Sequence, residues 1–266
     1  MNANRTMTEI QLPWYRPVAQ EVALFEACAE QQLPLLLKGP TGCGKSRFVE
    51  YMAARLGREL ITVACHDDTT ATDLLGRFLI RDGDTVWCDG PVTRAVRRGA
   101  VLYLDEIAEA RPDVVVAVHP LTDHRRELYL DRCDEVVTAT ADFMLVASFN
   151  PFYQQGLKEL KPSTRQRFVS LSFNYPTAAE EVEILMGETD CERAVARKLT
   201  ALAGKLRNAE LLGLAEIPST RLLVDAARLI HAGFPPRDAC RTAVIEPLTD
   251  DPPTVTAMCD LAALCF

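Results

Sequence analysis

The sequence predicts an α/β fold, a doubly wound parallel sheet followed by a small helical domain. Helix-like stretches alternate with apolar runs, as in the βα units of a parallel sheet. Beyond residue 175 the pattern is helical nearly to the end of the chain. The five apolar runs expected to form the sheet are Leu33–Leu37, Leu60–Ala64, Val101–Leu104, Phe143–Ser148 and Phe168–Phe173.

The first four apolar runs do not alternate with polar residues, so we expect strands that are buried on both faces. The helices between the strands carry ordinary boundary signals. Ser46–Leu56 is followed by Gly57, and Pro91–Arg98 is followed by Gly99. A third helix is expected over Pro112–Asp123, with proline in the first turn, where its missing N–H is tolerated.

A domain boundary is expected near residue 175, where Asn174-Tyr175-Pro176-Thr177 interrupts the α/β pattern. The predicted architecture is an α/β nucleotide-binding core over residues 1–175 and a C-terminal helical lid over residues 176–266. The lid has about 90 residues, which lies in the lower range for domains. Its expected helices are Ala178–Met186, Cys191–Leu206, Ser219–Ala232 and Arg237–Val244.

Two β-hairpins are expected as insertions in the core. Arg77–Ile80 and Thr85–Cys88 flank a turn that contains Asp-Gly, and Glu127–Leu130 and Glu135–Thr138 flank a second turn. Neither hairpin is needed to complete the sheet. Each is therefore either a surface hairpin without a role or a contact site for another molecule.

Composition narrows the class of function. The chain has 266 residues and a formal net charge of -8, which disfavours a nucleic-acid-binding surface. Its nine cysteines show no zinc-ligand spacing and are expected as buried residues in a reducing compartment. No secretory leader and no apolar run of about 18 residues is seen. These features predict a cytoplasmic protein that does not span a membrane.

The segment after the first predicted strand matches the phosphate-binding pattern G-x-x-x-x-G-K-S/T. Its glycines let backbone N–H groups turn toward phosphates, and a helix N-terminus follows. Lys45 is expected to reach the β and γ phosphates of ATP, and Ser46 to offer its hydroxyl to Mg²⁺. The segment is Gly39-Pro40-Thr41-Gly42-Cys43-Gly44-Lys45-Ser46.

The strand at Val101–Leu104 ends in two carboxylates, Asp105 and Glu106. Strand ends in such sheets face the ligand crevice. Asp105 is predicted to hold Mg²⁺, directly or through water, and Glu106 to activate the attacking water as a general base. The alternative is an acidic cap at the start of a helix.

Further polar residues follow later strands or open a helix. Asn150 either orients the attacking water or is a turn residue before proline. Arg165 and Arg167 either reach the γ-phosphate of a neighbouring subunit or are solvated surface charges. Arg221 opens a helix of the lid, where it either senses the γ-phosphate or lies in a capping region.

In this order the motifs resemble those of an AAA+ P-loop ATPase, over nearly the whole chain. Finer features resemble the MoxR branch. Ser148-Phe149-Asn150-Pro151 is similar to its A-T-x-N-P, and Gln166-Arg167-Phe168 is similar to its L-D-R-F, with Gln in place of Asp. That departure leaves Arg167 the better arginine-finger candidate and Arg165 a second one. The two hairpins resemble the inserts of that branch.

Within the branch, the short length and His-Arg-Arg-Glu-Leu-Tyr-Leu at 124–130 resemble the CbbQ/NirQ/NorQ group, and CbbQ most. The resemblance implies a homohexameric ring in which Arg167 completes the neighbour's site. It also implies a separate partner with a von Willebrand A domain (CbbO-like) and Rubisco as the client. The ATPase would release tight-binding sugar phosphates from inhibited Rubisco.

Three alternatives remain open from the sequence. A NorQ- or NirQ-type ATPase would activate or load metal into nitric oxide reductase. A small-molecule P-loop kinase would need an acceptor pocket and no arginine from a neighbour. DNA-dependent loading or helicase work is disfavoured by the net charge of -8.

Overall fold

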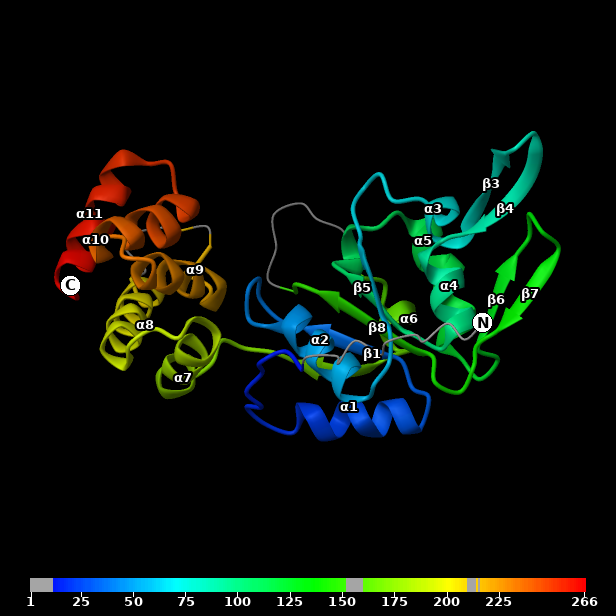
Figure 1. Ribbon diagram of the computed structural model, residues 1–266, viewed down its shortest axis with the longest axis horizontal. Helices are drawn as coiled ribbons and strands as arrows, with labels where there is room; N and C mark the ends of the chain where they lie inside the picture. The colour runs from blue at the N-terminus through cyan, green and yellow to red at the C-terminus, as the bar shows by residue number, and fades with distance from the viewer. Residues whose placement is uncertain (1–11, 152–159, 210–213, 215) are drawn as a thin grey trace, which may run out of the picture. The chain divides into compact units, whose positions relative to one another are not determined.

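The computed structural model describes residues 12–151, 160–209, 214 and 216–266. Its main sheet has five strands, all parallel, in the order β2-β5-β8-β1-β9 (Figure 1). This confirms the predicted α/β fold, with each strand within two residues of its expected bounds. The strands are β1 (Leu35–Lys38), β2 (Leu60–Ala64), β5 (Val101–Asp105), β8 (Met144–Phe149) and β9 (Val169–Ser172).

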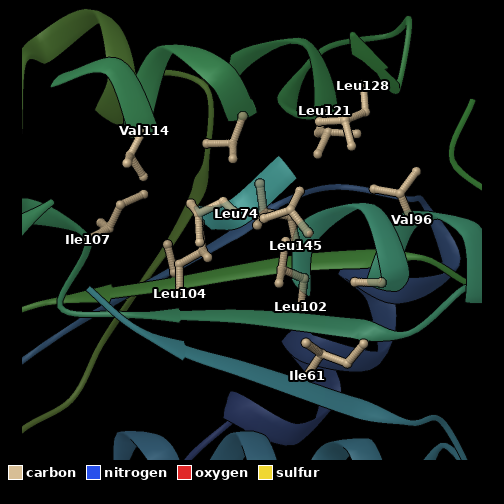
Figure 2. Packing of buried hydrophobic residues seen from close by; sticks show 14 of the residues in the cluster. Ile61, Leu74, Val96, Leu102, Leu104, Ile107, Val114, Leu121, Leu128 and Leu145 are labelled. Atoms are coloured by element: carbon tan, nitrogen blue, oxygen red, sulfur yellow. The ribbon is translucent and has the colours of Figure 1, made fainter. Parts of the chain in front are cut away.

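The core of the α/β unit lies between one face of this sheet and the helices that cover it. Leu102 and Leu104 of β5 and Leu145 of β8 point to the same side, toward Leu74 and Val114 (Figure 2). All five side chains are almost completely buried. Because successive side chains of a strand alternate between faces, Tyr103 and Asp105 lie on the opposite face from Leu102 and Leu104.

Three helices of this unit, α2, α4 and α5, lie on predicted stretches, and α1, α3 and α6 were not predicted. The third predicted helix ends at Val118, five residues early, and continues as a 3₁₀ turn over His119–Thr122. Pro120 has no backbone N–H and cannot bond to Val116, so the α-helix cannot continue through it. The helices are α1 (Glu21–Glu30), α2 (Lys45–Arg55), α3 (Ala71–Leu75), α4 (Pro91–Arg98), α5 (Pro112–Val118) and α6 (Pro162–Arg165).

Both predicted hairpins are present. The first is formed by β3 (Gly76–Arg81) and β4 (Asp84–Asp89), and the second by β6 (Glu127–Leu130) and β7 (Glu135–Thr138). Asp82 and Gly83 both have positive φ, as the two-residue turn of a hairpin requires. The hairpins project from the same end of the α/β unit, and α4 packs against strands of both (Figure 1).

Contacts along the chain divide it into two units. One contains Ala19–Gly39 and Lys45–Ser172, and the other contains Trp14–Val18, Pro40–Gly44 and Phe173–Phe266. The middle of the phosphate-binding loop thus groups with the C-terminal helices. We describe each unit by itself.

The second unit is built from helices around its own apolar core, which includes Leu185, Leu199, Leu223 and Met258. The predicted helix Arg237–Val244 is a short α-helix that continues as a π-helical segment, Arg241–Ile245. The α-helices are α7 (Ala178–Thr189), α8 (Arg193–Arg207), α9 (Thr220–His231), α10 (Pro236–Cys240) and α11 (Pro252–Ala263). Among the helices of the described residues, none has the length and apolarity that crossing a membrane requires.

Candidate functional site

The phosphate-binding loop connects β1 to α2. Gly42 and Gly44 both have positive φ, which only glycine adopts without strain. Lys45 is 6% exposed, and its Nζ donates to the carbonyl oxygen of Gly39 at 2.9 Å. The Lys45 ammonium group therefore lies beside Gly39, the first residue of the phosphate-binding loop.

The register of the sheet brings the other predicted residues to the same edge. Lys38 of β1 lies opposite Phe149 of β8, so Gly39 follows one strand where Asn150 follows the other. The N–H of Gly39 donates to the carbonyl of Phe149 at 3.4 Å. Strand β5 is the other neighbour of β8 and ends in Asp105. The carboxyl ends of three adjacent strands thus meet at one edge of the sheet, which is where such sheets bind their ligands.

Asp105 is the centre of a cluster of hydroxyl groups. Its Oδ1 accepts from the Tyr103 hydroxyl at 2.6 Å and from Ser148 Oγ at 2.6 Å. Its Oδ2 accepts from Ser46 Oγ at 3.4 Å, and Ser46 Oγ lies 3.3 Å from the Tyr103 hydroxyl. We name this set of four residues the Asp105 cluster. It fixes the carboxylate beside the first turn of α2.

The Asp105 cluster suits a magnesium ion. Mg²⁺ prefers oxygen ligands, and Ser46 and Asp105 supply a hydroxyl and a carboxylate at 3.4 Å from each other. Oδ1 of Asp105 already accepts two short hydrogen bonds, so Oδ2 is the oxygen with capacity for a cation. Burial, and then the charge of Asp105, raise the pKa of Tyr103, so its hydroxyl remains a donor.

Glu106 directly follows the cluster in a left-handed backbone conformation, with φ 57° and ψ 47°. This region is sparsely populated by residues other than glycine, and such strain concentrates at functional sites. The N–H of Glu106 donates to Ser148 Oγ at 3.0 Å. Ser148 thus holds both acidic residues, Asp105 through its carboxylate and Glu106 through its backbone.

Arg165 and Arg167 are exposed and lie outside the Asp105 cluster. Arg165 ends the short helix α6. Arg167 Nη1 lies 3.6 Å from Oδ2 of Asp123, which also accepts from Arg125 at 2.6 Å. The hydrogen bonds from Arg125 hold the pKa of Asp123 at about 2. Asp123 therefore stays negative, and it faces Arg167 at the surface.

Arg221 belongs to the second unit, where it is the second residue of α9. A Cβ atom placed on Gly42 would lie 3.3 Å from Cβ of Arg221 and 2.6 Å from the side chain of Ser219. The loop segment Pro40–Gly44, which is part of this unit, therefore lies against the first turn of α9. Among the predicted site residues, Arg221 is the one from the C-terminal helices that lies close to this loop segment.

Sequence reasoning missed Tyr103 and Ser148. Tyr103 could have been found, because residues i and i+2 of a strand share a face and Tyr103 precedes Asp105 by two. Ser148 could not, because only the strand order places β8 beside β5. Its bonds to Asp105 and to Glu106 depend on that pairing.

The fold, the phosphate loop and the acidic strand end define a P-loop ATPase of the AAA class. The chain matches the AAA domain (dynein-related subfamily) over residues 34–168. Residues 181–265 match the CbbQ/NirQ/NorQ C-terminal domain. The chain belongs to the CbbQ/NirQ/NorQ family of AAA ATPases. This assignment makes it a nucleotide-binding ATPase and removes the small-molecule kinase from consideration.

Curated relatives extend along nearly the whole chain. The denitrification regulatory protein NirQ of Pseudomonas aeruginosa is 56% identical, covering 95% of this chain and 97% of its own. The protein NorQ of Paracoccus denitrificans is 56% identical over 97% and 95%. The protein CbbQ of Hydrogenophilus thermoluteolus is 53% identical over 90% of each chain. NirQ and NorQ are thus as similar as CbbQ, so these identities do not favour CbbQ in particular.

Solved structures show the same fold at much lower identity. A RuvB mutant of Thermotoga maritima superposes with a TM-score of 0.56 at 16% identity. The match covers 92% of this chain and 71% of that chain. At this identity the likeness concerns the fold alone.

Proposed function

We propose that this chain is the motor subunit of a protein-remodelling machine, with an ATP site in residues 1–175 and a lid in residues 176–266. The observation that carries the proposal is the Asp105 cluster, in which Ser46 and Ser148 bond to one carboxylate at a strand end. In this proposal Lys45 holds the β and γ phosphates. Ser46 and Asp105 hold Mg²⁺, which neutralises phosphate charge when it is bound.

The hydrolytic step is proposed to use Glu106 and Asn150. Glu106 takes a proton from the attacking water as general base, and Asn150 orients that water. The left-handed backbone at Glu106 supports this role, because strain of this kind persists only where the surroundings enforce it. Ser148 is the neighbour that bonds to the backbone there.

The site is proposed to be completed by arginines from outside the Asp105 cluster. Arg167, with Arg165 as second candidate, neutralises charge on the γ-phosphate in the neighbouring subunit. Arg221 contacts the γ-phosphate from the lid. A site divided in this way requires a neighbouring subunit. We propose that the subunits form a homohexameric ring, since head-to-tail contacts can close into rings.

The proposed client is Rubisco, and the proposed adaptor is a separate CbbO-like chain with a von Willebrand A domain, all in the cytoplasm. The support is the 53% identity to a CbbQ protein, together with the resemblance of residues 124–130 to the CbbQ/NirQ/NorQ group. Cycles of ATP binding and release would move the hairpins β3–β4 and β6–β7 against the client, loosening an active-site loop.

A second client, nitric oxide reductase, is favoured by a specific observation. The NirQ and NorQ relatives are each 56% identical to this chain over at least 95% of its length. In that case the same motor would activate the reductase or help load its metal. The site chemistry is the same for both clients, and only the protein that the hairpins contact differs.

Reconstitution separates the two clients. Purified chain, a von Willebrand A partner and ATP are added either to sugar-phosphate-inhibited Rubisco or to inactive nitric oxide reductase. Recovery of carboxylation above an ATP-free control supports Rubisco, and recovery of the reductase supports the second client. The Glu106→Gln variant is the matched control, because it should bind ATP without driving either reaction. Failure in both arms, across cognate forms of each client, would reject both assignments.

A further inference from the structure

A buried ion pair lies in the helical unit beside the start of α9. Glu181 of α7 is completely buried. Its carboxylate accepts from Nη2 of Arg207 at 2.8 Å and from Nη1 at 3.0 Å. A bidentate arginine–carboxylate pair has a fixed geometry. Because burying two charges is costly, stability alone is a weak reason for such a pair, and its other contacts indicate what it does.

Two of those contacts hold the residues that precede Arg221. Arg207 Nε donates to the carbonyl of Pro218 at 2.9 Å. Thr220 Oγ1 donates to Glu181 Oε1 at 2.8 Å. Ser219 lies between them at the N-cap of α9 and makes no side-chain capping bond. The ion pair, rather than a cap, therefore fixes the first turn of α9.

A third contact runs from the ion pair to the phosphate loop. The guanidinium of Arg207 lies 4.7 Å from the centroid of the Tyr175 ring. The Tyr175 hydroxyl donates to the carbonyl of Thr41 at 3.0 Å, and Thr41 belongs to the same unit. Burial raises the pKa of Tyr175 to about 12, so this hydroxyl keeps its proton at physiological pH.

The loop also approaches α9 directly. Gly42 has φ +69°, and a Cβ placed on it would lie 2.6 Å from the side chain of Ser219. There is no room for a side chain between the loop and the helix start. Two sets of contacts therefore fix the position of Arg221 relative to the loop. One is the close approach of Gly42 to Ser219, and the other is the pair of bonds from the ion pair to Pro218 and Thr220.

We propose that Glu181 and Arg207 are positioning residues that set Arg221 against the γ-phosphate of ATP and link it to the phosphate loop. Neither residue touches the nucleotide; both act through Arg221. The inference rests on the proposed role of Arg221. It predicts that damage to the link changes the discrimination between ATP and ADP, because ADP lacks the γ-phosphate.

The test uses Thr220, because removing its hydroxyl removes the bond between Glu181 and α9 and leaves the ion pair and its bond to Pro218 in place. Thr220→Val should lower the ratio of ATP affinity to ADP affinity about threefold to tenfold, the loss of one hydrogen bond. Thr220→Ser keeps the hydroxyl and should restore the ratio. Thr200→Val is the matched control. Thr200 is also a buried threonine of this unit, and its Oγ1 has no hydrogen-bond partner among the described residues.

The decisive comparison is a double-mutant cycle. In an Arg221→Ala background, Thr220→Val should change neither the ATP/ADP affinity ratio nor the turnover any further, because it acts through Arg221. An additive effect, or a Thr220→Val protein that behaves like Thr200→Val, overturns the proposal and leaves the role of Arg221 standing. Wild-type discrimination and turnover in Arg221→Ala itself would overturn that role and the inference together.

Discussion

Ser148 is the residue that joins the two acidic groups of the site. It is completely buried, donates to Asp105 and accepts from the backbone of Glu106. A buried hydroxyl with both bonds made is rigid, and a buried donor or acceptor that loses its partner is costly. Ser148 therefore fixes both the proposed metal ligand and the proposed base.

Replacing Ser148 by alanine tests this. The Asp105 carboxylate loses a short charge-assisted bond and the Glu106 N–H loses its acceptor, together about 1.5–3 kcal/mol. If this free energy is lost in the transition state, ATP turnover should drop about tenfold to a hundredfold. The Mg²⁺ concentration needed for half-maximal turnover should also rise. Steady-state hydrolysis over a magnesium titration measures both effects. Ser172→Ala, at an exposed position of β9, is the control and should be silent.

Glu106→Gln tests the general base. Glutamine has nearly the same shape and suits the left-handed backbone no worse, so the change isolates the charge. ATP should still bind, and hydrolysis should fall about 10²-fold to 10⁴-fold, the usual contribution of a positioned base. Nucleotide binding and single-turnover hydrolysis are measured side by side. Glu109→Gln, in the following 3₁₀ turn, should turn over normally. Normal hydrolysis by Glu106→Gln would remove it from that role.

The predicted residues that the sheet edge brings together share one property: each lies next to a strand end. Gly39, Asp105 and Asn150 follow apolar runs that are readable in the sequence. Tyr103 and Ser148 also belong to the site, but they lie within strands β5 and β8. At such positions the sequence does not distinguish a functional polar residue from an ordinary residue of the core. Their roles depend on which strands are neighbours, and a single sequence does not give strand order.

At the scale of elements, the base of the first hairpin depends on a glycine. Gly90 is the N-cap of α4 and donates its N–H to the carbonyl of Leu75 at 2.9 Å. A Cβ at this position would collide with the backbone of Leu74 and lie 2.8 Å from the carbonyl oxygen of Asp73. The hairpin and α4 can therefore meet only where residue 90 has no side chain.

Gly90→Ala should lower the free energy of unfolding by about 2–3 kcal/mol, because backbone atoms must move to admit the methyl group. Gly83→Ala, at the tip of the same hairpin, is the matched control. Its Cβ meets nothing within 4 Å, and only its φ of +90° opposes the change. That strain costs about 1–2 kcal/mol. Urea denaturation measures both variants. An effect of Gly90→Ala no larger than that of Gly83→Ala would contradict the packing argument.

The strands of the main sheet and helices α2, α4 and α5 were predictable, because they carry clear local signals, whereas α1, α3, α6 and α11 were not predicted. The differences within the predicted helices have physical causes. Pro120 shortens α5, and the last predicted helix changes to π-helical bonding at Arg241–Ile245. A helix of about eight apolar and polar residues gives no sign of its bonding pattern, since that is decided by the core it packs into.

At the scale of the whole molecule, the proposed mechanism leaves the site of one chain incomplete. The Asp105 cluster supplies oxygen ligands, and Glu106 beside it is the proposed base. Arg167 lies outside the cluster, with its side chain 38% exposed and its Nη1 3.6 Å from Asp123. An exposed arginine held weakly by a surface carboxylate can be transferred to an anion on another molecule. A γ-phosphate in an adjacent subunit is such an anion.

Mixing two inactive variants tests whether the site is shared. Lys45→Ala loses the phosphate-binding ammonium, whereas Arg167→Ala keeps its own loop and should bind ATP normally but not hydrolyse it. In a mixed ring, an Arg167→Ala subunit next to a Lys45→Ala subunit has an intact loop and an intact neighbouring arginine. Its site should therefore regain turnover, and at equal mixing about a quarter of the interfaces should be complete, by chance pairing in a ring. Repeating the mixture with Arg165→Ala identifies which arginine is supplied. If the mixture is as inactive as its components, each chain uses its own Arg167. The proposal of a site shared between subunits would then be wrong.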